Sequence, residues 1–173
     1  MEETEAITTY DVLCRASLPV TLVSTSKTLH VKGAHGLEVK TQVLMAWPSF
    51  RDAESLILPG GMQGVNNLWD TKRMKEILNM HTHKDTLIAA ICAAPIILGR
   101  LELLSGKTAT CYPGLEGELK GATTSNEAVV EDGNIITSRG PATATAFALK
   151  IVEHLSGKEV AEKVAQGMLY GLQ

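Results

Sequence analysis

One cysteine lies where the chain is predicted to change from a strand to a helix. Residues 87–91 are a short, β-branched apolar run, which predicts a buried parallel strand. Cys92 follows directly, and Pro95 suits the first turn of a helix, where its missing N–H leaves no bond unmade. A thiol in such a turn projects from the end of the sheet, beside free N–H groups that favour the reactive thiolate. The pattern predicts a reactive cysteine; the alternative is a structural core cysteine.

Two further strand ends carry residues suited to a ligand site. Residues 55–61 read as a buried strand ending in Pro-Gly-Gly, and residues 135–138 read as a strand followed by Arg139 and Gly140. Strands alternate with helices along the chain, which predicts a parallel sheet covered on both faces. Ligands bind at the carboxyl ends of the strands in such sheets. We therefore expect these two strand ends to lie close to Cys92.

The remaining elements follow from apolar periodicity and from turn residues. Before the cysteine we expect a helix over residues 1–16, a strand over 18–24, a small hairpin from 28–31 and 37–43, and a helix over 70–83. After it we expect a helix from 95 to about 104, a strand over 108–112, a helical turn at 116–120, a hairpin from 128–130 and 135–138, and helices over 139–155 and 158–168.

Composition limits the class of protein. A chain of 173 residues, 45% hydrophobic but only 4% aromatic, suits a single α/β domain with an aliphatic core. A net charge of −3 gives no electrostatic case for nucleic acid or anionic membrane. The sequence shows no signal peptide and no apolar stretch of the roughly 20 residues that span a bilayer. Its odd number of cysteines, without metal-ligand spacing, favours a reduced, cytoplasmic protein: Cys14, Cys92 and Cys111.

Several motifs together resemble the ThiJ/PfpI superfamily, within it the branch of the Parkinsonism-associated deglycase. They are LILPGG at 56–61, AAICAAP at 89–95, TSRGPAT at 137–143 and FALKIVEHLSGKEVAEKV at 147–164. The opening EETEAITTYDVLCRA is similar to the family's first helix, so the resemblance covers nearly the whole chain. It implies a flavodoxin-like three-layer α/β sandwich with a mostly parallel sheet. It also implies a homodimer that needs no metal or organic cofactor.

The resemblance implies a site built around Cys92. Glu5, matched through EETEA, would hydrogen-bond the cysteine sulfur, and a carboxyl buried there would keep its proton and donate it. The backbone N–H groups of Gly61 and Ala93 would form an oxyanion hole. Without the resemblance, Glu5 reads as a solvated residue of a first helical turn and the glycines read as a plain tight turn.

The chain departs from the family pattern in three ways. The family's first strand is missing, which would leave a gap and unpaired backbone groups in the sheet; we expect a truncated or misassigned start, with a rearranged chain as the alternative. Tyr112 stands where many members place a histidine near the cysteine, which argues against a Cys–His pair. Ala93 replaces the histidine of the peptidase-like branch, and His154 lacks the glutamate of the amidotransferases, so neither activity is expected.

Gly60, Tyr112 and Arg139 are further candidates for a substrate pocket. Arg139 could bind an anionic substrate group, and a structural ion pair with Asp11 across the dimer-side surface is equally compatible with the sequence. Cys111 reads as a core residue, with a second redox thiol as the alternative.

No metal site is expected. His81 and His83 are two positions apart on a predicted helix, so they point to different sides and suit a metal poorly.

The sequence supports two functions. In the first, the Cys92 thiolate attacks a reactive carbonyl such as methylglyoxal, Glu5 moves protons, and the Gly61 and Ala93 amides hold the oxygen. The same chemistry on glycated amines or thiols would be a deglycase activity. In the second, Cys92 is an oxidative-stress sensor, or part of a chaperone, without significant turnover. A purely structural homologue is a third possibility.

Overall fold

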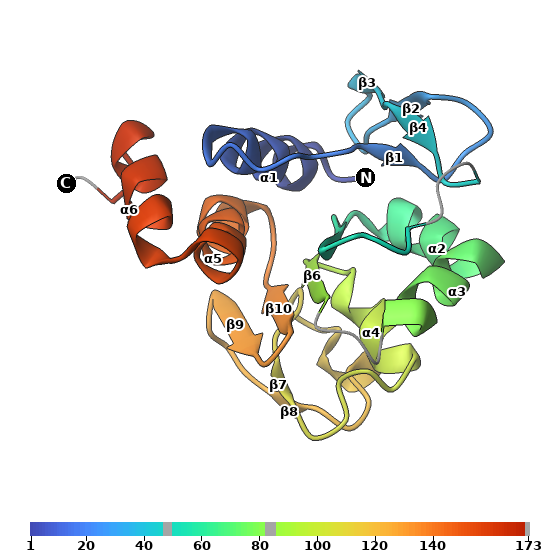
Figure 1. Cartoon of the computed structure of the whole chain (residues 1–173). Helices are drawn as coiled ribbons and strands as arrows, with labels where there is room; N and C mark the ends of the chain where they lie inside the picture. The colour runs from blue at the N-terminus through green and yellow to red at the C-terminus, as the bar shows by residue number, and fades with distance from the viewer. Residues whose placement is uncertain (47–49, 82–85, 172–173) are drawn as a thin grey trace.

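A four-stranded sheet forms the centre of the computed structural model, which describes residues 1–46, 50–81 and 86–171 (Figure 1). The first three strands in spatial order are parallel to their neighbours, and the fourth is antiparallel. In that order the strands are β5 (Ser55–Leu58), β6 (Leu87–Ile91), β10 (Ile135–Ser138) and β9 (Val129–Asp132). The strand before Cys92 and the hairpin formed by the last two strands are thereby confirmed.

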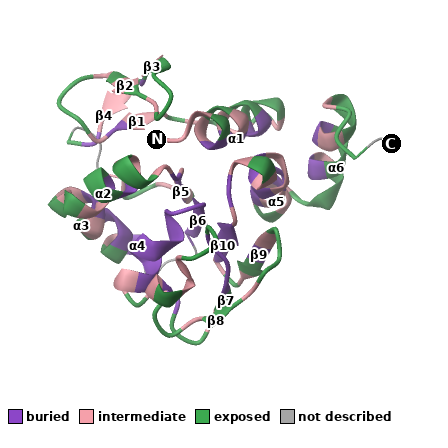
Figure 2. Cartoon of the chain, turned by 180° about the vertical axis from the view of Figure 1, so that it is seen from behind, coloured by how far each residue is buried: buried purple, intermediate pink, exposed green. Residues whose placement is uncertain are grey.

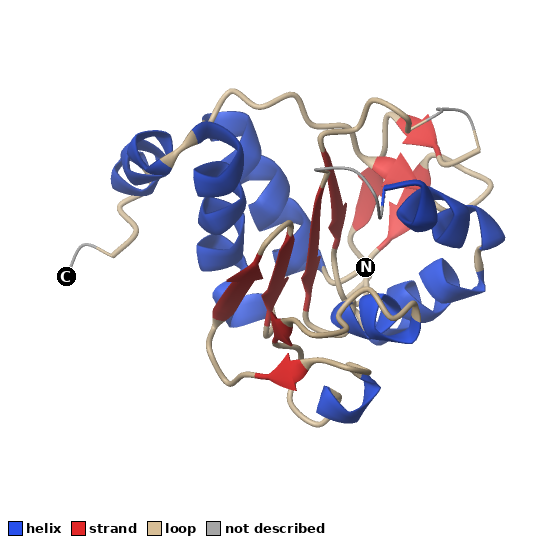
Figure 3. Ribbon diagram, turned by 60° about the horizontal axis from the view of Figure 1, so that its bottom comes forward, coloured by secondary structure: helices blue, strands red, loops and turns tan. Residues whose placement is uncertain are grey.

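Helices cover both faces of this sheet, which confirms the three-layer α/β sandwich (Figures 1 and 3). One layer holds α1 (Glu3–Arg15) and α5 (Ala144–Ser156), with α6 (Lys158–Gly167) packed on α5 away from the sheet. The other layer holds α2 (Met62–Asp70), α3 (Lys72–His81) and α4 (Pro95–Arg100). No helix in the described ranges is both long enough and apolar enough to span a bilayer.

The segment that carries the cysteine is continuously buried. Every residue of β6 is buried, and so is every residue from Cys92 to Gly99 (Figure 2). Ala89 and Ala90 are fully buried, and their small side chains let helices pack closely on both faces of this central strand. The turn at the carboxyl end of β6 is therefore held by a close-packed core.

In the described part of the chain, three two-stranded pairs lie outside the central sheet. They are β1 (Val23–Ser24) with β4 (Val43–Leu44), β2 (His30–Lys32) with β3 (Glu38–Lys40), and β7 (Thr108–Ala109) with β8 (Thr123–Thr124). The antiparallel β2–β3 pair is the predicted small hairpin. The strand predicted over 18–24 shrinks to two residues, because among the described residues β1 pairs with β4 alone. The gap expected in the sheet lies between β1 and β5, which do not pair with each other.

Several other predicted boundaries were wrong. Helix α2 was missed, because Gly61 and Gly64 interrupt its sequence pattern, and α3 begins at Lys72. Helix α4 ends at Arg100 instead of near residue 104, because Glu102 takes a left-handed conformation with φ 59°. The strand predicted over 108–112 is only Thr108–Ala109, and the long helix after residue 139 begins at Ala144, behind the 3₁₀ turn Pro141–Thr143. The predicted turn near 116–120 is the 3₁₀ turn Glu116–Glu118.

A glycine inside α4 makes the packing of that helix testable. A Cβ on Gly99 would collide with the Glu118 carbonyl oxygen and lie 2.8 Å from the Leu119 Cα. We expect Gly99→Ala to lower the free energy of unfolding by about 1–3 kcal/mol, because overpacking outweighs the helix propensity of alanine. Gly167→Ala on α6 is the control, because nothing lies within 4 Å of its Cβ position. Its free energy of unfolding should not fall below that of the wild type. Urea unfolding measures both, and equal stability of the two variants would contradict the packing argument.

Candidate active site

Cys92 lies at the carboxyl end of β6 in a strained backbone conformation. Its φ is 66°, which is uncommon for a residue with a side chain. The Cys92 N–H donates to the Ser138 carbonyl at 2.9 Å, and the Cys92 carbonyl accepts from the Tyr112 N–H at 2.8 Å. Neighbouring segments on both sides thus hold the turn in place. Cys92 is 8% exposed, so its thiol is buried with a small opening to solvent.

Glu5 is fully buried, contrary to the solvated residue that its local sequence suggests. Its Oε2 accepts a hydrogen bond from the Gly60 N–H at 2.7 Å. Its Oε1 is buried without a hydrogen-bond partner among the described residues, while the carboxyl interacts with the Cys92 thiol. The structure therefore brings together the glutamate and the cysteine that the resemblance implied.

Two features of the chain's start hold Glu5 in this position. The Glu2 carboxylate accepts from the Glu5 N–H at 2.8 Å and caps α1. The Glu2 N–H donates to the Gly60 carbonyl at 3.0 Å, which docks the first turn of α1 on the end of β5.

Gly60 and Gly61 are required by the close approach of these segments. A Cβ on Gly60 would lie 2.6 Å from the Cys92 Cβ and 2.7 Å from the Glu5 Oε2. Gly61 has a φ of 85°, and a Cβ there would lie 2.8 Å from the Glu2 nitrogen. The strand-ending glycines predicted from the sequence therefore do more than form a tight turn, because they leave room for both Glu5 and Cys92.

Burial controls the electrostatics of the pair. Burial raises the pKa of Glu5 above its ordinary value. Burial also raises the pKa of Cys92 to about 12, together with the charge and hydrogen bond of an ionised Glu5, whereas the Gly61 and Ala93 N–H groups lower it. The thiolate predicted from the helix terminus alone was therefore wrong, because that argument left out desolvation and the carboxyl.

Each of the two groups affects the pKa of the other. When Glu5 keeps its proton, the repulsion that disfavours a Cys92 thiolate is removed, and the carboxyl can donate to the sulfur. The backbone N–H groups of Gly61 and Ala93 then stabilise the negative sulfur. The arrangement can therefore hold a single proton that moves between oxygen and sulfur.

Tyr112 and Arg139 lie on the segments that flank Cys92. The Tyr112 ring lies against Gly140, whose Cβ would be 3.4 Å from the ring, and the residue is 48% exposed. The Arg139 guanidinium donates to the Asn126 carbonyl and side-chain oxygens at 3.1 and 2.9 Å. Within the chain Asp11 pairs with Arg15 at 2.6 Å, and the alternative Arg139–Asp11 ion pair across the dimer-side surface stays a prediction.

The other two cysteines differ in burial. Cys111 is 2% exposed in the hydrophobic core, and burial, with the charge of Glu116, raises its pKa to about 11. This agrees with the interpretation of Cys111 as a core residue. Cys14 on α1 is exposed.

Sequence reasoning missed the role of Ser138 and Thr143. The Ser138 hydroxyl donates to the Ala128 carbonyl at 2.8 Å and lies 2.6 Å from the Thr143 hydroxyl, which in turn bonds to Gly140. These bonds fix the strand end whose carbonyl accepts the Cys92 N–H. The available signal was the pair of hydroxyl residues around Arg-Gly-Pro, a pattern typical of turns in which a side-chain hydroxyl hydrogen-bonds the backbone.

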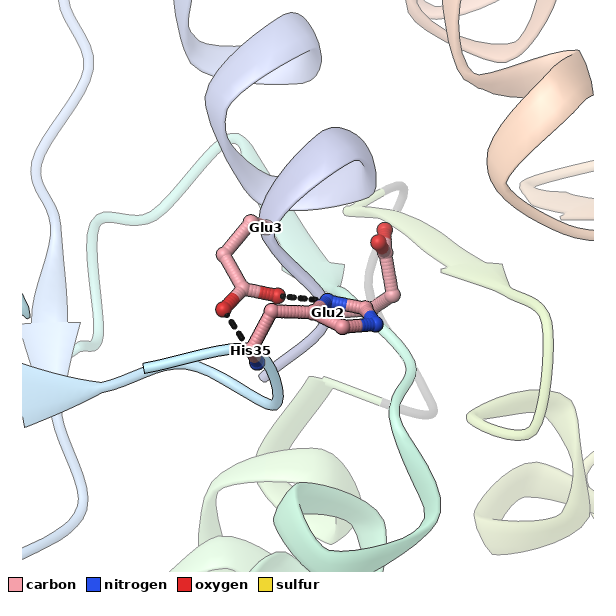
Figure 4. Close-up of side chains that lie close together, drawn as sticks. All are labelled: Glu2, Glu3 and His35. Carbon is pink, nitrogen blue, oxygen red and sulfur yellow. Dashed lines mark hydrogen bonds and ion pairs between the residues drawn. The ribbon is translucent and has the colours of Figure 1, made fainter. Parts of the chain in front are cut away.

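Two groups of potential metal ligands are satisfied by protein contacts. His81 is fully buried, with Nδ1 2.8 Å from the Thr86 hydroxyl and Nε2 2.7 Å from the Phe50 carbonyl; His83 lies outside the described residues. Figure 4 shows the second group, in which the Glu3 carboxylate points at His35. Its oxygens lie 2.6 Å from the His35 backbone nitrogen and 2.9 Å from the His35 Nδ1.

These contacts change the titration of Glu3. Burial raises the pKa of Glu3, but the hydrogen bonds from the His35 side chain and backbone outweigh this effect and lower the pKa to about 2. The Glu2 carboxylate is occupied as the cap of α1. The group therefore links α1 to the β2–β3 loop.

The raised pKa of Glu5 predicts a specific dependence of stability on pH. Below the unfolded-state pKa of about 4.5, Glu5 is neutral in both states and costs nothing. As the pH rises from there through the folded-state pKa, the unfolded chain ionises first, so folding is increasingly disfavoured. Glu5→Gln removes this penalty, so its free energy of unfolding relative to wild type should increase over this pH interval. Urea unfolding at several pH values measures this difference. A difference in the free energy of unfolding that stays constant over this interval would contradict the assigned shift.

Several known proteins are similar to this chain in sequence and in fold. The DJ-1/PfpI family model matches residues 1–154. Drosophila melanogaster Protein dj-1beta is 38% identical over 170 residues, covering 97% of this chain and 91% of that protein, and its crystal structure gives a TM-score of 0.91. The Danio rerio Parkinson disease protein 7 homolog is 36% identical over 94% of this chain and 88% of that protein. The structure of oxidized Toxoplasma gondii DJ-1 is 34% identical, with a TM-score of 0.93 over 98% of this chain and 93% of that one. The chain belongs to the DJ-1/PfpI family.

Proposed function

We propose that this DJ-1-like protein is a cysteine-dependent enzyme of the glyoxalase or deglycase type, acting on small reactive carbonyls such as methylglyoxal. One observation carries the proposal: the buried Glu5 carboxyl, one oxygen of which has no hydrogen-bond partner among the described residues, interacts with the Cys92 thiol, and two backbone N–H groups also act on the sulfur. A nucleophile, an acid–base group and donors for an oxyanion are thereby assembled from different segments of the chain.

The first step is addition to the aldehyde. Cys92 gives its proton to Glu5, and the thiolate attacks the aldehyde carbon of methylglyoxal. The S–C bond forms while the C=O electron pair moves to oxygen, where the Gly61 and Ala93 N–H groups stabilise the charge. Glu5 then donates its proton to that oxygen, which gives a hemithioacetal.

The second step is an internal redox isomerisation followed by hydrolysis. The Glu5 carboxylate removes the proton from the former aldehyde carbon and passes it to the ketone oxygen, which gives an enediol. The hydroxyl on the sulfur-bearing carbon then gives its proton to Glu5, which delivers a proton to the neighbouring carbon. The product is a thioester of lactate, because the aldehyde carbon is oxidised and the ketone carbon is reduced. Water cleaves the thioester, releases lactate and restores the thiol. The same addition applies to carbonyl adducts of amines and thiols, and no cofactor enters the balance.

Tyr112 stands where many family members have a histidine, so another residue must act as the base. Because tyrosine is a poor base near neutral pH, we assign proton transfer to Glu5. The Tyr112 ring, which lies beside Gly140, then contributes an aromatic surface near Cys92. The expected homodimer and the expected cytoplasmic location stay predictions of the sequence.

Cysteine substitution tests the proposal. Purified protein should consume methylglyoxal and produce lactate, and Cys92→Ala should reduce turnover to the uncatalysed background, because the covalent step is lost. Glu5→Gln should lower turnover by about 10²–10⁴-fold, since it removes the acid–base group. Cys14→Ala is the matched control, because Cys14 is exposed on α1, and it should keep wild-type turnover. Turnover that survives in a folded Cys92→Ala protein would overturn the proposal.

Oxidative-stress sensing is the second candidate, and the unpartnered Glu5 Oε1 supports it. A sulfinate on Cys92 would offer oxygens that a protonated Glu5 and the Gly61 and Ala93 N–H groups could bind.

Mild peroxide treatment tests this candidate. We expect an intact-mass increase of two oxygens located by peptide mapping on Cys92, although Cys14 is the more exposed cysteine. In Glu5→Gln, oxidation should proceed less selectively, since the donor to the sulfinate is changed. Oxidation on Cys14 and Cys111 at the same rate would argue against a dedicated sensor.

A further inference from the structure

Tyr112 is an exposed aromatic side chain beside the turn that carries Cys92. Its backbone N–H donates to the Cys92 carbonyl at 2.8 Å, and its own carbonyl accepts from the Leu115 N–H at 3.1 Å. Its side chain nevertheless stays exposed, although burial of an aromatic ring stabilises a fold. Among the described residues, Tyr170 near the end of the chain is the other exposed aromatic side chain. The Tyr112 backbone is therefore fixed next to Cys92, while its ring is available to a ligand.

The Tyr112 ring lies over the main chain that follows β10. A Cβ on Gly140 would be 3.4 Å from the Tyr112 Cδ2 and 3.8 Å from its Cε2, so an added methyl group would already touch the ring. Gly140 is two residues after Ser138, whose carbonyl accepts from the Cys92 N–H at 2.9 Å. The ring therefore covers the strand end that is hydrogen-bonded to the Cys92 turn.

Tyr112 and the acid–base group Glu5 approach Cys92 from opposite sides of β6. In the central sheet β6 lies between β5 and β10, and the main chain that follows β5 binds the Glu5 carboxyl. The Gly61 N–H, which acts on the sulfur, belongs to the same segment. A carbonyl carbon bonded to the Cys92 sulfur, with its oxygen at the Gly61 and Ala93 N–H groups, then directs its other substituent toward the β10 side. In a 2-oxoaldehyde, that substituent is the ketone carbon and the group it carries.

The surface on the β10 side suits a flat apolar group. The face of an aromatic ring gains from offset or edge contact with a second ring as well as from burial of apolar area. A methyl group can cover only a small part of the ring, whereas a phenyl group has a planar surface of the same size. The charge of Arg139, which precedes Gly140, is already hydrogen-bonded to the Asn126 carbonyl and side-chain oxygens.

We propose that Tyr112 selects 2-oxoaldehydes with a planar aromatic group, which stacks on its ring while the aldehyde carbon reacts with Cys92. This selectivity rests on the proposed function, because it concerns the substrate of the same chemistry. The aldehyde carbon is again oxidised and the ketone carbon reduced, so phenylglyoxal and water give mandelate as methylglyoxal and water give lactate. The aromatic group takes no part in bond making, so Tyr112 determines specificity and is not a catalytic residue.

Paired kinetics with phenylglyoxal and methylglyoxal test this selectivity. Wild-type protein should have the higher kcat/KM for phenylglyoxal. Tyr112→Leu keeps an apolar side chain without a ring, so it should lower kcat/KM for phenylglyoxal about tenfold and that for methylglyoxal by less than about twofold. Tyr112→Phe keeps the ring and should retain the preference. Tyr170→Leu is the matched control, because Tyr170 is similarly exposed but lies after α6, and it should change neither value. A Tyr112→Leu protein with the wild-type ratio of the two values would overturn the selectivity.

Binding without turnover separates this selectivity from the proposed enzyme function. Cys92→Ala cannot form the covalent adduct, so mandelate and lactate are titrated into it and followed by nuclear magnetic resonance. We expect mandelate to bind about fivefold more tightly than lactate and to shift the Tyr112 ring resonances. The same titration of Cys92→Ala combined with Tyr112→Leu should show no preference. Absence of turnover with both substrates would overturn the enzyme function alone, whereas equal binding of mandelate and lactate to Cys92→Ala would overturn the selectivity.

Discussion

The main chain of Gly60 is the constraint on which the site depends. Its N–H binds the Glu5 carboxyl and its carbonyl accepts from the Glu2 N–H, so one residue ties the start of α1 to the end of β5. Hydrogen bonds to an ionisable group contribute about 1.5–3 kcal/mol, and leaving a buried carboxyl without them costs a similar amount. Any side chain at position 60 would occupy the space of the Cys92 Cβ and the Glu5 carboxyl. Position 60 therefore has to be glycine, because its main chain binds both Glu2 and Glu5 and no side chain would fit there.

The site combines two groups that burial drives toward their neutral forms. Neither a lone buried thiol nor a lone buried carboxyl would react readily at neutral pH, because desolvation opposes both ions. Their contact changes this, since one proton can move between them without adding net charge to the interior. Backbone N–H groups at the turn then decide where the negative charge is most stable. The strained φ of Cys92 is maintained because hydrogen bonds from Tyr112 and to Ser138 fix the turn.

Local patterns predicted the parts of the structure that local forces determine. The strand, cysteine and proline of the central turn, the two glycines after β5 and the alternation of strands with helices could all be read from the sequence. The burial of Glu5 could not, because an acidic residue in a first helical turn has the same local pattern whether it is solvated or buried; only the family resemblance indicated it. The direction of the Cys92 pKa shift was wrong for the same reason, since desolvation is a tertiary property. The strand at 18–24 was overextended because its length depends on a neighbouring strand.

The contact between Glu3 and His35 has a consequence for how the molecule opens. The β2–β3 hairpin lies outside the central sheet, and the Met1 carbonyl accepts from the Ala34 N–H at 3.0 Å beside the Glu3–His35 bonds. Hydrogen bonds therefore join the hairpin loop to the first turn of α1. Opening of the hairpin would break bonds to the same segment that carries Glu2, the cap of α1, and Glu5. A peripheral loop is in this way coupled to the protonation chemistry of the core.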